Sequence, residues 1–310
     1  MTALSEKILA DWQVRKTKKQ KTAFIEFMKS QIPEIQVEKG GFGKNRNLVI
    51  GDVKSADVIL GAHYDTCARM FLPNFLSPKN ILLYLLYSLL ICIPVFAVAV
   101  LINMALHLVT ENPLLLYYGT FLPTLAVVYF MFMGGPANPH TVNDNTSGVV
   151  MLCEIWAAMS PQQRGKTAFV FFDNEENGLL GSAFFRKLHK NDGLKKKLMI
   201  NYDCVSDGEH MLFVLSKPAL KAYGDDFVEA FPNGADMTAH VECSSNTMYP
   251  SDQAGFPMGV GVAAMKKKWF VGLYINRIHT ARDTVLRREN IDYLTAGTLR
   301  LLDKLRGEGR

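Results

Sequence analysis

Two long segments without charged side chains constrain the fold of this 310-residue chain more than any other feature. Residues 81–109 and 113–142 contain no Asp, Glu, Lys or Arg. The apolar runs inside them, residues 81–106 and 114–133, are each long enough to cross a hydrocarbon core of about 30 Å as a helix. We therefore expect a transmembrane hairpin, with a pair of buried core helices or an apolar lid as the alternatives.

The basic residues around these runs predict an orientation in the membrane. The connecting segment 107–113 has no Lys or Arg, whereas Arg69 and Lys79 precede the first run. The positive-inside rule then places both outer segments in the cytoplasm and the connecting segment outside. An odd number of cysteines without a CxxC pair agrees, because free thiols are typical of a reducing compartment. These cysteines are Cys67, Cys92, Cys153, Cys204 and Cys243.

Charge and local composition narrow the class of protein. The formal net charge of +5 is mildly basic. The basic run at residues 15–21 is either a solvated helix face or a contact for anionic lipid or nucleic acid. Without a P-loop, zinc-finger spacing or RNA-binding signature, we expect no nucleic-acid partner. Residues 1–20 lack the apolar run of a secretory signal peptide, and no pattern indicates an oligomeric state.

Outside the hairpin, strand patterns alternate with helical patterns. This alternation predicts one α/β domain, a three-layer α/β/α arrangement with a mixed central sheet, built from residues 1–70 and 136–310 and interrupted by the hairpin at 78–135. We expect strands at 35–38, 47–50, 57–61, 167–172, 198–202, 211–215, 260–264 and 271–275. We expect helices at 5–31, 149–159, 178–189, 218–231 and 288–305, and a loop at 233–257.

Metal-ligating side chains follow several of the predicted strands or precede a helix. The carboxyl ends of strands in an open α/β sheet meet at one edge, so we expect these side chains to converge. Two histidines with several carboxylates suit Zn²⁺, and the carboxylates are too many for one tetrahedral ion. Two ions sharing one carboxylate would use them all. The candidates are His63, Asp65, Asp144, Glu175, Glu176, Asp203, His279 and Asp283.

Two adjacent glutamates mark the turn after the strand at 167–172. Neighbouring like charges repel and raise a pKa, so the pair is unfavourable unless it has a chemical role. The pair is explained if one carboxylate holds a cation and the other transfers protons. Taken alone, the segment is equally consistent with a solvated acidic turn.

The ordered set of these motifs resembles the co-catalytic di-zinc aminopeptidase family, which also includes glutamate carboxypeptidase-like enzymes and, more distantly, glutaminyl cyclases. The likeness covers nearly all of the chain except the hairpin. The motifs are His63-x-Asp65, Asn143-Asp144-Asn145-x-Ser147-Gly148, Glu175-Glu176-x-Gly178-Leu179-x-Gly181-Ser182, Asp203, and His279-Thr280-x-x-Asp283-Thr284.

The resemblance implies a role for each of these residues. Glu175 would be the general base and acid, acting on a water that bridges two zinc ions. Asp65 would orient His63 through its second ring nitrogen, and Asp283 would support the His279 loop. A cis peptide is expected at Asp144–Asn145. The implied ligands are His63 and Asp203 for the first zinc, Glu176 and His279 for the second, and Asp144 bridging both.

The chain also departs from the family pattern. Ile278 stands where relatives often have a tyrosine that stabilises an oxyanion, and Gln253 stands where they often have a histidine. The hairpin is inserted between His63 and Asp144, so it must emerge beside the mouth of the site. These departures affect the expected substrate specificity more than the expected metal binding.

We therefore expect a membrane-anchored di-zinc metallopeptidase, an aminopeptidase with a cytoplasmic catalytic domain, acting on peptide substrates. A carboxypeptidase or deacylase with the same site is one alternative. A catalytically dead membrane scaffold is another, although all five ligand positions and the base are filled. His140, His189, His210 and His240 are expected to be surface or loop residues rather than ligands.

Overall fold

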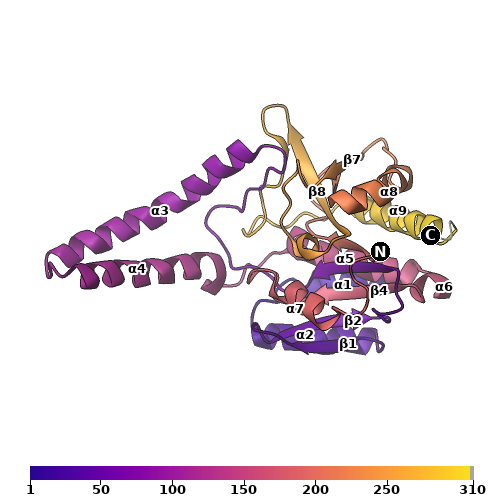
Figure 1. Ribbon diagram of the computed structural model, residues 1–310, viewed down its shortest axis with the longest axis horizontal. Helices are drawn as coiled ribbons and strands as arrows, with labels where there is room; N and C mark the ends of the chain where they lie inside the picture. The colour runs from indigo at the N-terminus through magenta and orange to yellow at the C-terminus, as the bar shows by residue number, and fades with distance from the viewer. Residues whose placement is uncertain (308–310) are drawn as a thin grey trace.

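One mixed β-sheet organises the body of the protein in the computed structural model, which describes residues 1–307 (Figure 1). Its strand order is β1-β2-β4-β3-β5-β8-β6-β7, and β9 pairs with β8. The strands are β1 (Gln36–Gly40), β2 (Asn45–Ile50), β3 (Val58–His63), β4 (Thr167–Phe172), β5 (Leu198–Tyr202), β6 (His210–Leu215), β7 (Thr238–Cys243), β8 (Gly259–Lys268) and β9 (Gly272–Tyr274).

The four central strands β4, β3, β5 and β8 are parallel. In their register His63 pairs with Phe172, so β3 and β4 end at the same level. We call this end of the sheet the carboxyl edge. Loops that follow parallel strands meet there, which is where α/β proteins place their ligands.

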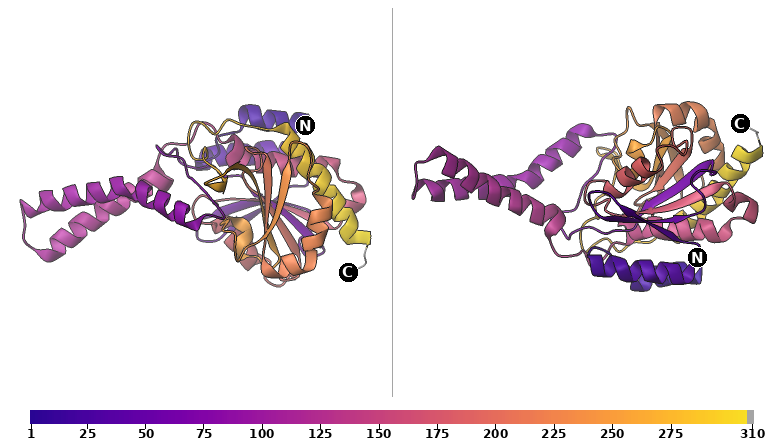
Figure 2. Two further views of the ribbon diagram at one scale, coloured as in Figure 1. Left: turned by 90° about the horizontal axis from the view of Figure 1, so that it is seen from above. Right: turned by 60° about the horizontal axis from the view of Figure 1, so that its bottom comes forward.

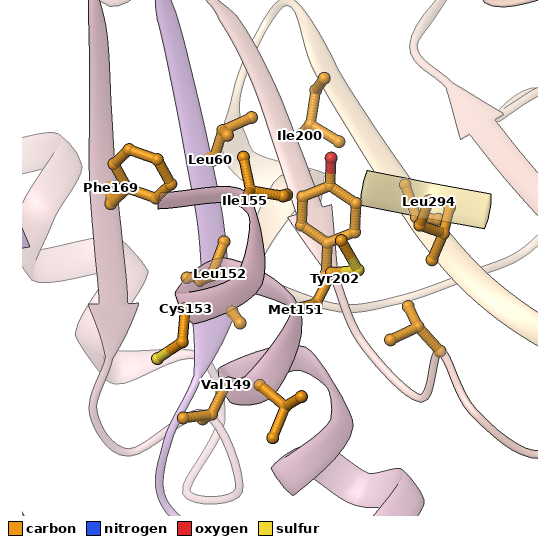
Figure 3. Close-up of a cluster of buried hydrophobic side chains, with 14 of the residues drawn as sticks. Leu60, Val149, Met151, Leu152, Cys153, Ile155, Phe169, Ile200, Tyr202 and Leu294 are labelled. Atoms are coloured by element: carbon orange, nitrogen blue, oxygen red, sulfur yellow. The ribbon is translucent and has the colours of Figure 1, made fainter. Parts of the chain in front are cut away.

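Helices cover both faces of the sheet (Figure 2). Along β3, Leu60 packs in one cluster with α5, whereas Ile59 packs in the opposite cluster with Phe185 of α7. Figure 3 shows the α5 side chains, Leu152 among them, packed against the sheet. The helices on the first face are α1 (Ala3–Asp11), α2 (Lys18–Gln31), α5 (Ser147–Ala158), α8 (Lys217–Ala230) and α9 (Arg288–Gly307). The second face is covered by α7 (Leu180–Leu188). The remaining helix of the body, α6 (Pro161–Arg164), is short. The predicted α/β class and mixed sheet are confirmed.

Three element predictions need correction. The helix expected at 5–31 is two helices, because Thr17 starts α2 with a capping box to Gln20. The loop expected at 233–257 contains β7, a half-buried strand parallel to β6. β8 runs on to Lys268, beyond the expected strand at 260–264, because its last residues pair with β9.

Two helices project from the body as a hairpin (Figures 1 and 2). They are α3 (Ile81–His107) and α4 (Pro113–Tyr129), and a π-helical turn, η1 (Phe130–Gly134), continues α4. Neither helix has a buried residue, so the alternative of buried core helices is wrong. By length and composition, α3 is long and apolar enough to cross a membrane, and so is α4 together with η1. Asn103 donates a hydrogen bond to Thr120 at 3.0 Å, which links the helices.

Candidate metal centre and active site

The five side chains expected to bind zinc gather at the carboxyl edge. His63 is the last residue of β3, and Asp203 directly follows β5. Glu176 lies in the turn after β4, Asp144 lies just before α5, and His279 lies in the loop after β9. Strand order, rather than proximity in the chain, therefore brings these residues together.

Asp144 occupies the centre of the cluster. Its Oδ1 lies 3.3 Å from Nε2 of His63, and its Oδ2 lies 3.2 Å from Nε2 of His279. Burial alone would raise the pKa of Asp144, but the two histidines hold that pKa well below its ordinary value. The two oxygens of one carboxylate thus face two different histidines, as a carboxylate shared by two cations requires.

One further carboxylate completes each half of the cluster. Asp203 Oδ1 lies 3.6 Å from Nε2 of His63, and Glu176 Oε2 lies 3.4 Å from Nε2 of His279. Burial, with the charges of Asp144 and Asp203 adding, raises the pKa of Glu176 well above its ordinary value. Repelling buried carboxylates of this kind are stabilised by a cation.

Glu175 adjoins the cluster. One of its carboxylate oxygens lies within 4.8 Å of ligand atoms of His63 and Glu176. Burial raises the pKa of Glu175 well above its ordinary value, and the charges of Glu176 and Asp203 add to this effect. A buried carboxyl group of raised pKa beside a cluster of potential metal ligands suits a residue that accepts and releases a proton.

The donor set fits zinc. It offers imidazole nitrogens and carboxylate oxygens, the ligands that zinc prefers. Within residues 1–307, Glu176 Oε1 and His279 Nδ1 are buried and have no hydrogen-bond partner. Three groups of three potential ligands lie close enough to hold an ion: two of them contain His63, and the third contains His279.

The comparison with protein families agrees with this geometry. Residues 127–300 match the model of peptidase family M28, which is more than half of the chain. The chain belongs to peptidase family M28. Zinc dependence is a property of this family. The matched range begins after β3, so the structure, and not the family match, brings His63 to the M28 cluster.

Solved structures share the M28 fold at low sequence identity. The Legionella pneumophila LapA aminopeptidase is 14% identical, with 99% of this chain and 70% of that chain covered at a TM-score of 0.60. Porphyromonas gingivalis glutaminyl cyclase is 15% identical, with 97% of this chain and 96% of that chain covered at a TM-score of 0.58. A search of curated protein sequences gave no significant match.

Asp65 lies near the second ring nitrogen of His63, as expected, and also contacts the glutamate turn of the M28 site. Its carboxylate accepts the backbone N–H groups of Glu175 at 3.0 Å and Glu176 at 3.2 Å. Nδ1 of His63 lies 3.1 Å from the backbone carbonyl of Asp65, and 3.7 Å from its carboxylate. The side chain therefore holds the glutamate turn, and the main chain faces the histidine.

Asp283 differs from the expectation that it supports the His279 loop. Its carboxylate accepts the backbone N–H groups of Asn143 at 2.8 Å and Asp144 at 3.0 Å. Asp283 thus fixes the segment that carries the central carboxylate. The peptide bond between Asp144 and Asn145 is cis, as the resemblance implied.

The backbone around the M28 site is unusual. Asn174, Leu179, Cys204 and His279 have positive φ between 57° and 62°, although none is glycine. Such conformations cluster at functional sites, where the surrounding structure enforces them. Here they flank the glutamate turn, Asp203 and the loop of His279.

Two members of the basic run at 15–21 are internal rather than solvated or lipid-facing. Arg15 is fully buried, and its Nε donates to the carbonyl of Tyr64 at 2.5 Å. Lys21 donates to Asp173 at 2.6 Å and to Asn174 at 2.8 Å, just before the glutamate turn. Both expectations for this run are wrong at these two positions, because the side chains anchor the loops of the site.

A cleft of about 360 Å³ opens onto the site. Besides the cluster and Glu175, Tyr84 of α3 and Met133 of η1 line it, so the base of the hairpin forms part of its wall. Ile278 also lines the cleft and is buried. Tyr249, which the sequence did not single out, lines it too, and its hydroxyl donates to the carbonyl of Asp203 at 2.9 Å.

Two further buried groups near the site were not predicted as site residues. Cys67 lies with Glu176 and His279 in a group that could hold an ion, and burial raises the pKa of its thiol well above the ordinary value. Asp252 lies in the short helix η3 (Asp252–Gly255), and burial, partly opposed by His63, raises its pKa to about 7. Neither carries a local spacing that would have marked it.

Proposed function

We propose that this M28 chain is a membrane-anchored metallopeptidase that uses two zinc ions and removes residues from the N-termini of peptides. The observation that carries the proposal is Asp144, whose two oxygens face His63 and His279. His63 and Asp203 would hold one zinc, Glu176 and His279 the other, and Asp144 both.

Zinc, when bound, would lower the pKa of the attacking water and polarise the peptide carbonyl. Glu175 takes the proton of the attacking water and passes it to the leaving amine. Glu176 is turned toward His279, whereas its neighbour Glu175 reaches His63. The Asp65 carboxylate accepts both backbone N–H groups of the pair and so fixes the two glutamates in these different orientations.

The aminopeptidase assignment is supported by the fold shared with LapA over 99% of this chain. It is tested with purified full-length protein, its zinc content, and a panel of aminoacyl, N-blocked and N-terminal glutamine substrates. We expect two zinc ions per chain and hydrolysis of free aminoacyl substrates only.

Each other result of this panel assigns a different function. Cleavage of N-blocked substrates alone would indicate a carboxypeptidase or deacylase. Cyclisation of N-terminal glutamine would indicate a glutaminyl cyclase. A chain without zinc and without turnover would be a membrane scaffold. Any of these three outcomes overturns the aminopeptidase proposal.

We further propose that α3 and α4 cross the bilayer while residues 1–70 and 136–310 form the cytoplasmic catalytic domain. The lengths support this, since 27 residues in α3 and 22 from Pro113 to Gly134 span about 40 Å and 33 Å as helices, against about 30 Å of hydrocarbon. The exposure of apolar side chains such as Leu82, at 66%, and Leu122, at 57%, also supports it, because lipid would cover them. The positive-inside rule supplies the orientation.

A further inference from the structure

Exposed aromatic side chains outside the hairpin gather at one end of the molecule. Among residues 1–80 and 135–307, only four aromatic side chains are strongly exposed. Their exposed fractions are 96% for Phe42, 100% for Phe71, 94% for Trp269 and 61% for Phe270. We call these four residues the aromatic rim.

The strand register places Phe42, Trp269 and Phe270 at the carboxyl edge, and a hydrogen bond of Met70 places Phe71 there. Phe42 lies in the turn between β1 and β2, and β2 runs antiparallel to β4 with Leu48 opposite Phe171, so this turn extends past the end of β4. Phe71 follows β3, and the neighbouring Met70 donates to the carbonyl of His279 at 2.7 Å. Trp269 and Phe270 follow β8, which is parallel to β5.

The hairpin leaves the body from this same edge (Figure 1). Asn80, which caps α3, lies 3.5 Å from the carbonyl of Val271, next to Phe270. Ser77 also donates to the carbonyl of Val271 at 3.2 Å. The Trp269–Phe270 tip therefore lies beside the first turn of α3, where Ile81 and Leu82 are exposed.

The charges around the rim match an anionic surface. Lys44 is two residues from Phe42, Arg69 is two residues from Phe71, and Lys268 precedes Trp269. No Asp or Glu lies within three residues of any rim member. Exposed aromatics next to basic side chains are typical of segments at the interface of an anionic bilayer, where the rings sit at headgroup level.

We propose that the aromatic rim enters the interfacial region of an anionic phospholipid bilayer, with its basic neighbours at the phosphates. The inference rests on the proposed insertion of the hairpin. Contacts on both sides of the hairpin, at Phe42 and at Trp269, hold the catalytic body against the membrane. The cleft lined by Tyr84 then opens at the bilayer surface, and its substrates are peptides whose N-termini lie in that interface.

The test compares the full chain in bilayers of phosphatidylglycerol with the full chain in bilayers of phosphatidylcholine. The acyl chains of both lipids carry bromine, a quencher of tryptophan emission. The contribution of Trp269 is the difference between the wild-type chain and Trp269→Phe. The matched control is Trp269→Phe/Leu188→Trp, because Leu188 is half exposed and is the last residue of α7, whose first residue follows the glutamate turn. We expect lipid quenching of Trp269 to exceed that of the control several-fold, and aqueous iodide to quench only the control.

Phe42→Trp and Phe71→Trp, each made in the Trp269→Phe chain, report on the other rim positions and should behave like Trp269. Quenching of Trp269 should be stronger in phosphatidylglycerol than in phosphatidylcholine, and the variant Lys267→Gln/Lys268→Gln should lose this difference. Quenching of Trp269 by iodide at the level of the control overturns the proposal, as does equal quenching in both lipids. Alkaline extraction of the same membranes separates the two proposals, because an extracted chain means that the hairpin itself is not inserted.

Discussion

At the scale of single residues, Asp65 and Asp283 act in the same way from different segments. Each carboxylate accepts two consecutive backbone N–H groups, those of Glu175 and Glu176 in one case and those of Asn143 and Asp144 in the other. Charge-assisted hydrogen bonds of this kind are strong and directional. The proposed ligands Glu176 and Asp144 are therefore set by their main chain before any ion binds.

The first prediction separates the two glutamates. Glu175→Gln should keep zinc but lose about 10²–10⁴-fold in turnover, because the amide cannot accept the proton of the attacking water. Glu176→Ala should lose zinc. Zinc content and kcat are measured together, with the exposed Glu26→Gln as control. Full turnover of Glu175→Gln at normal zinc content would contradict the assigned role.

The second prediction concerns pH and metal removal. Burial raises the pKa of Asp252 and of Asp283 from 3.8 to about 7 in the folded chain without metal. A carboxyl group whose folded pKa is raised favours folding while protonated. Its stabilisation is complete below the unfolded pKa and is lost as pH rises through about 7. Chelator-treated protein should therefore lose thermal stability between about pH 4 and pH 7.

Bound zinc offsets this loss, because the cation stabilises the ionised carboxylates. The difference in Tm between zinc-loaded and chelated protein should thus widen as pH rises. Re-addition of zinc to the chelated sample is the control for irreversible damage. A Tm difference that is constant across this range would show that these carboxylates do not sense the metal.

The sequence could predict the residues of the cluster, because their motifs are local and follow strand ends. It could not predict which groups the side chains that hold the cluster in place would contact. Arg15 belongs to a basic run typical of solvated surface, yet it is fully buried with its Nε on the carbonyl of Tyr64. The Asp65 carboxylate lies 3.7 Å from Nδ1 of His63, but it accepts hydrogen bonds from a segment 110 residues later in the chain. Such contacts depend on tertiary packing rather than on spacing in the chain.

At the scale of elements, α3 is the hairpin helix that contributes a tyrosine to the cleft of the site. Tyr84 lies in its first turns and lines the cleft with Glu175. Tyr84→Ala should raise KM about tenfold for substrates with a large apolar N-terminal residue, because the substitution removes an aromatic part of the cleft wall. kcat should change little. Tyr118→Ala in α4, which lies outside the cleft lining, is the control; an equal effect there would exclude a local role for Tyr84.

Element predictions succeeded where apolar patterns were strong. The buried central strands and the hairpin helices have long apolar runs, which leave few alternative conformations. β7 was missed because Thr238, His240 and Glu242 make it polar, and a half-buried edge strand tolerates such residues. The break before α2 was marked in the sequence by Thr17 and Gln20, a capping box that the helical periodicity around it obscured.

At the scale of the whole molecule, the orientation across the membrane is the main prediction. A reporter enzyme active only outside the cytoplasm should be active when fused into the 107–113 loop and inactive when fused before Met1, because the basic residues lie in the outer segments. Both fusions are compared by enzyme activity per amount of protein. An active N-terminal fusion, or an inactive loop fusion, would contradict a cytoplasmic catalytic body.

The position of β3 in the sheet has a consequence for biosynthesis. β3 is made before the hairpin, but its neighbours β4 and β5 are made after it. If the hairpin inserts as proposed, it would therefore reach the bilayer before any other member of the His63 cluster has been made. Chains fold progressively as they are synthesised. On the proposed topology, activity would arise only after the chain has reached its membrane, so newly made cytoplasmic polypeptides would not meet an unanchored peptidase.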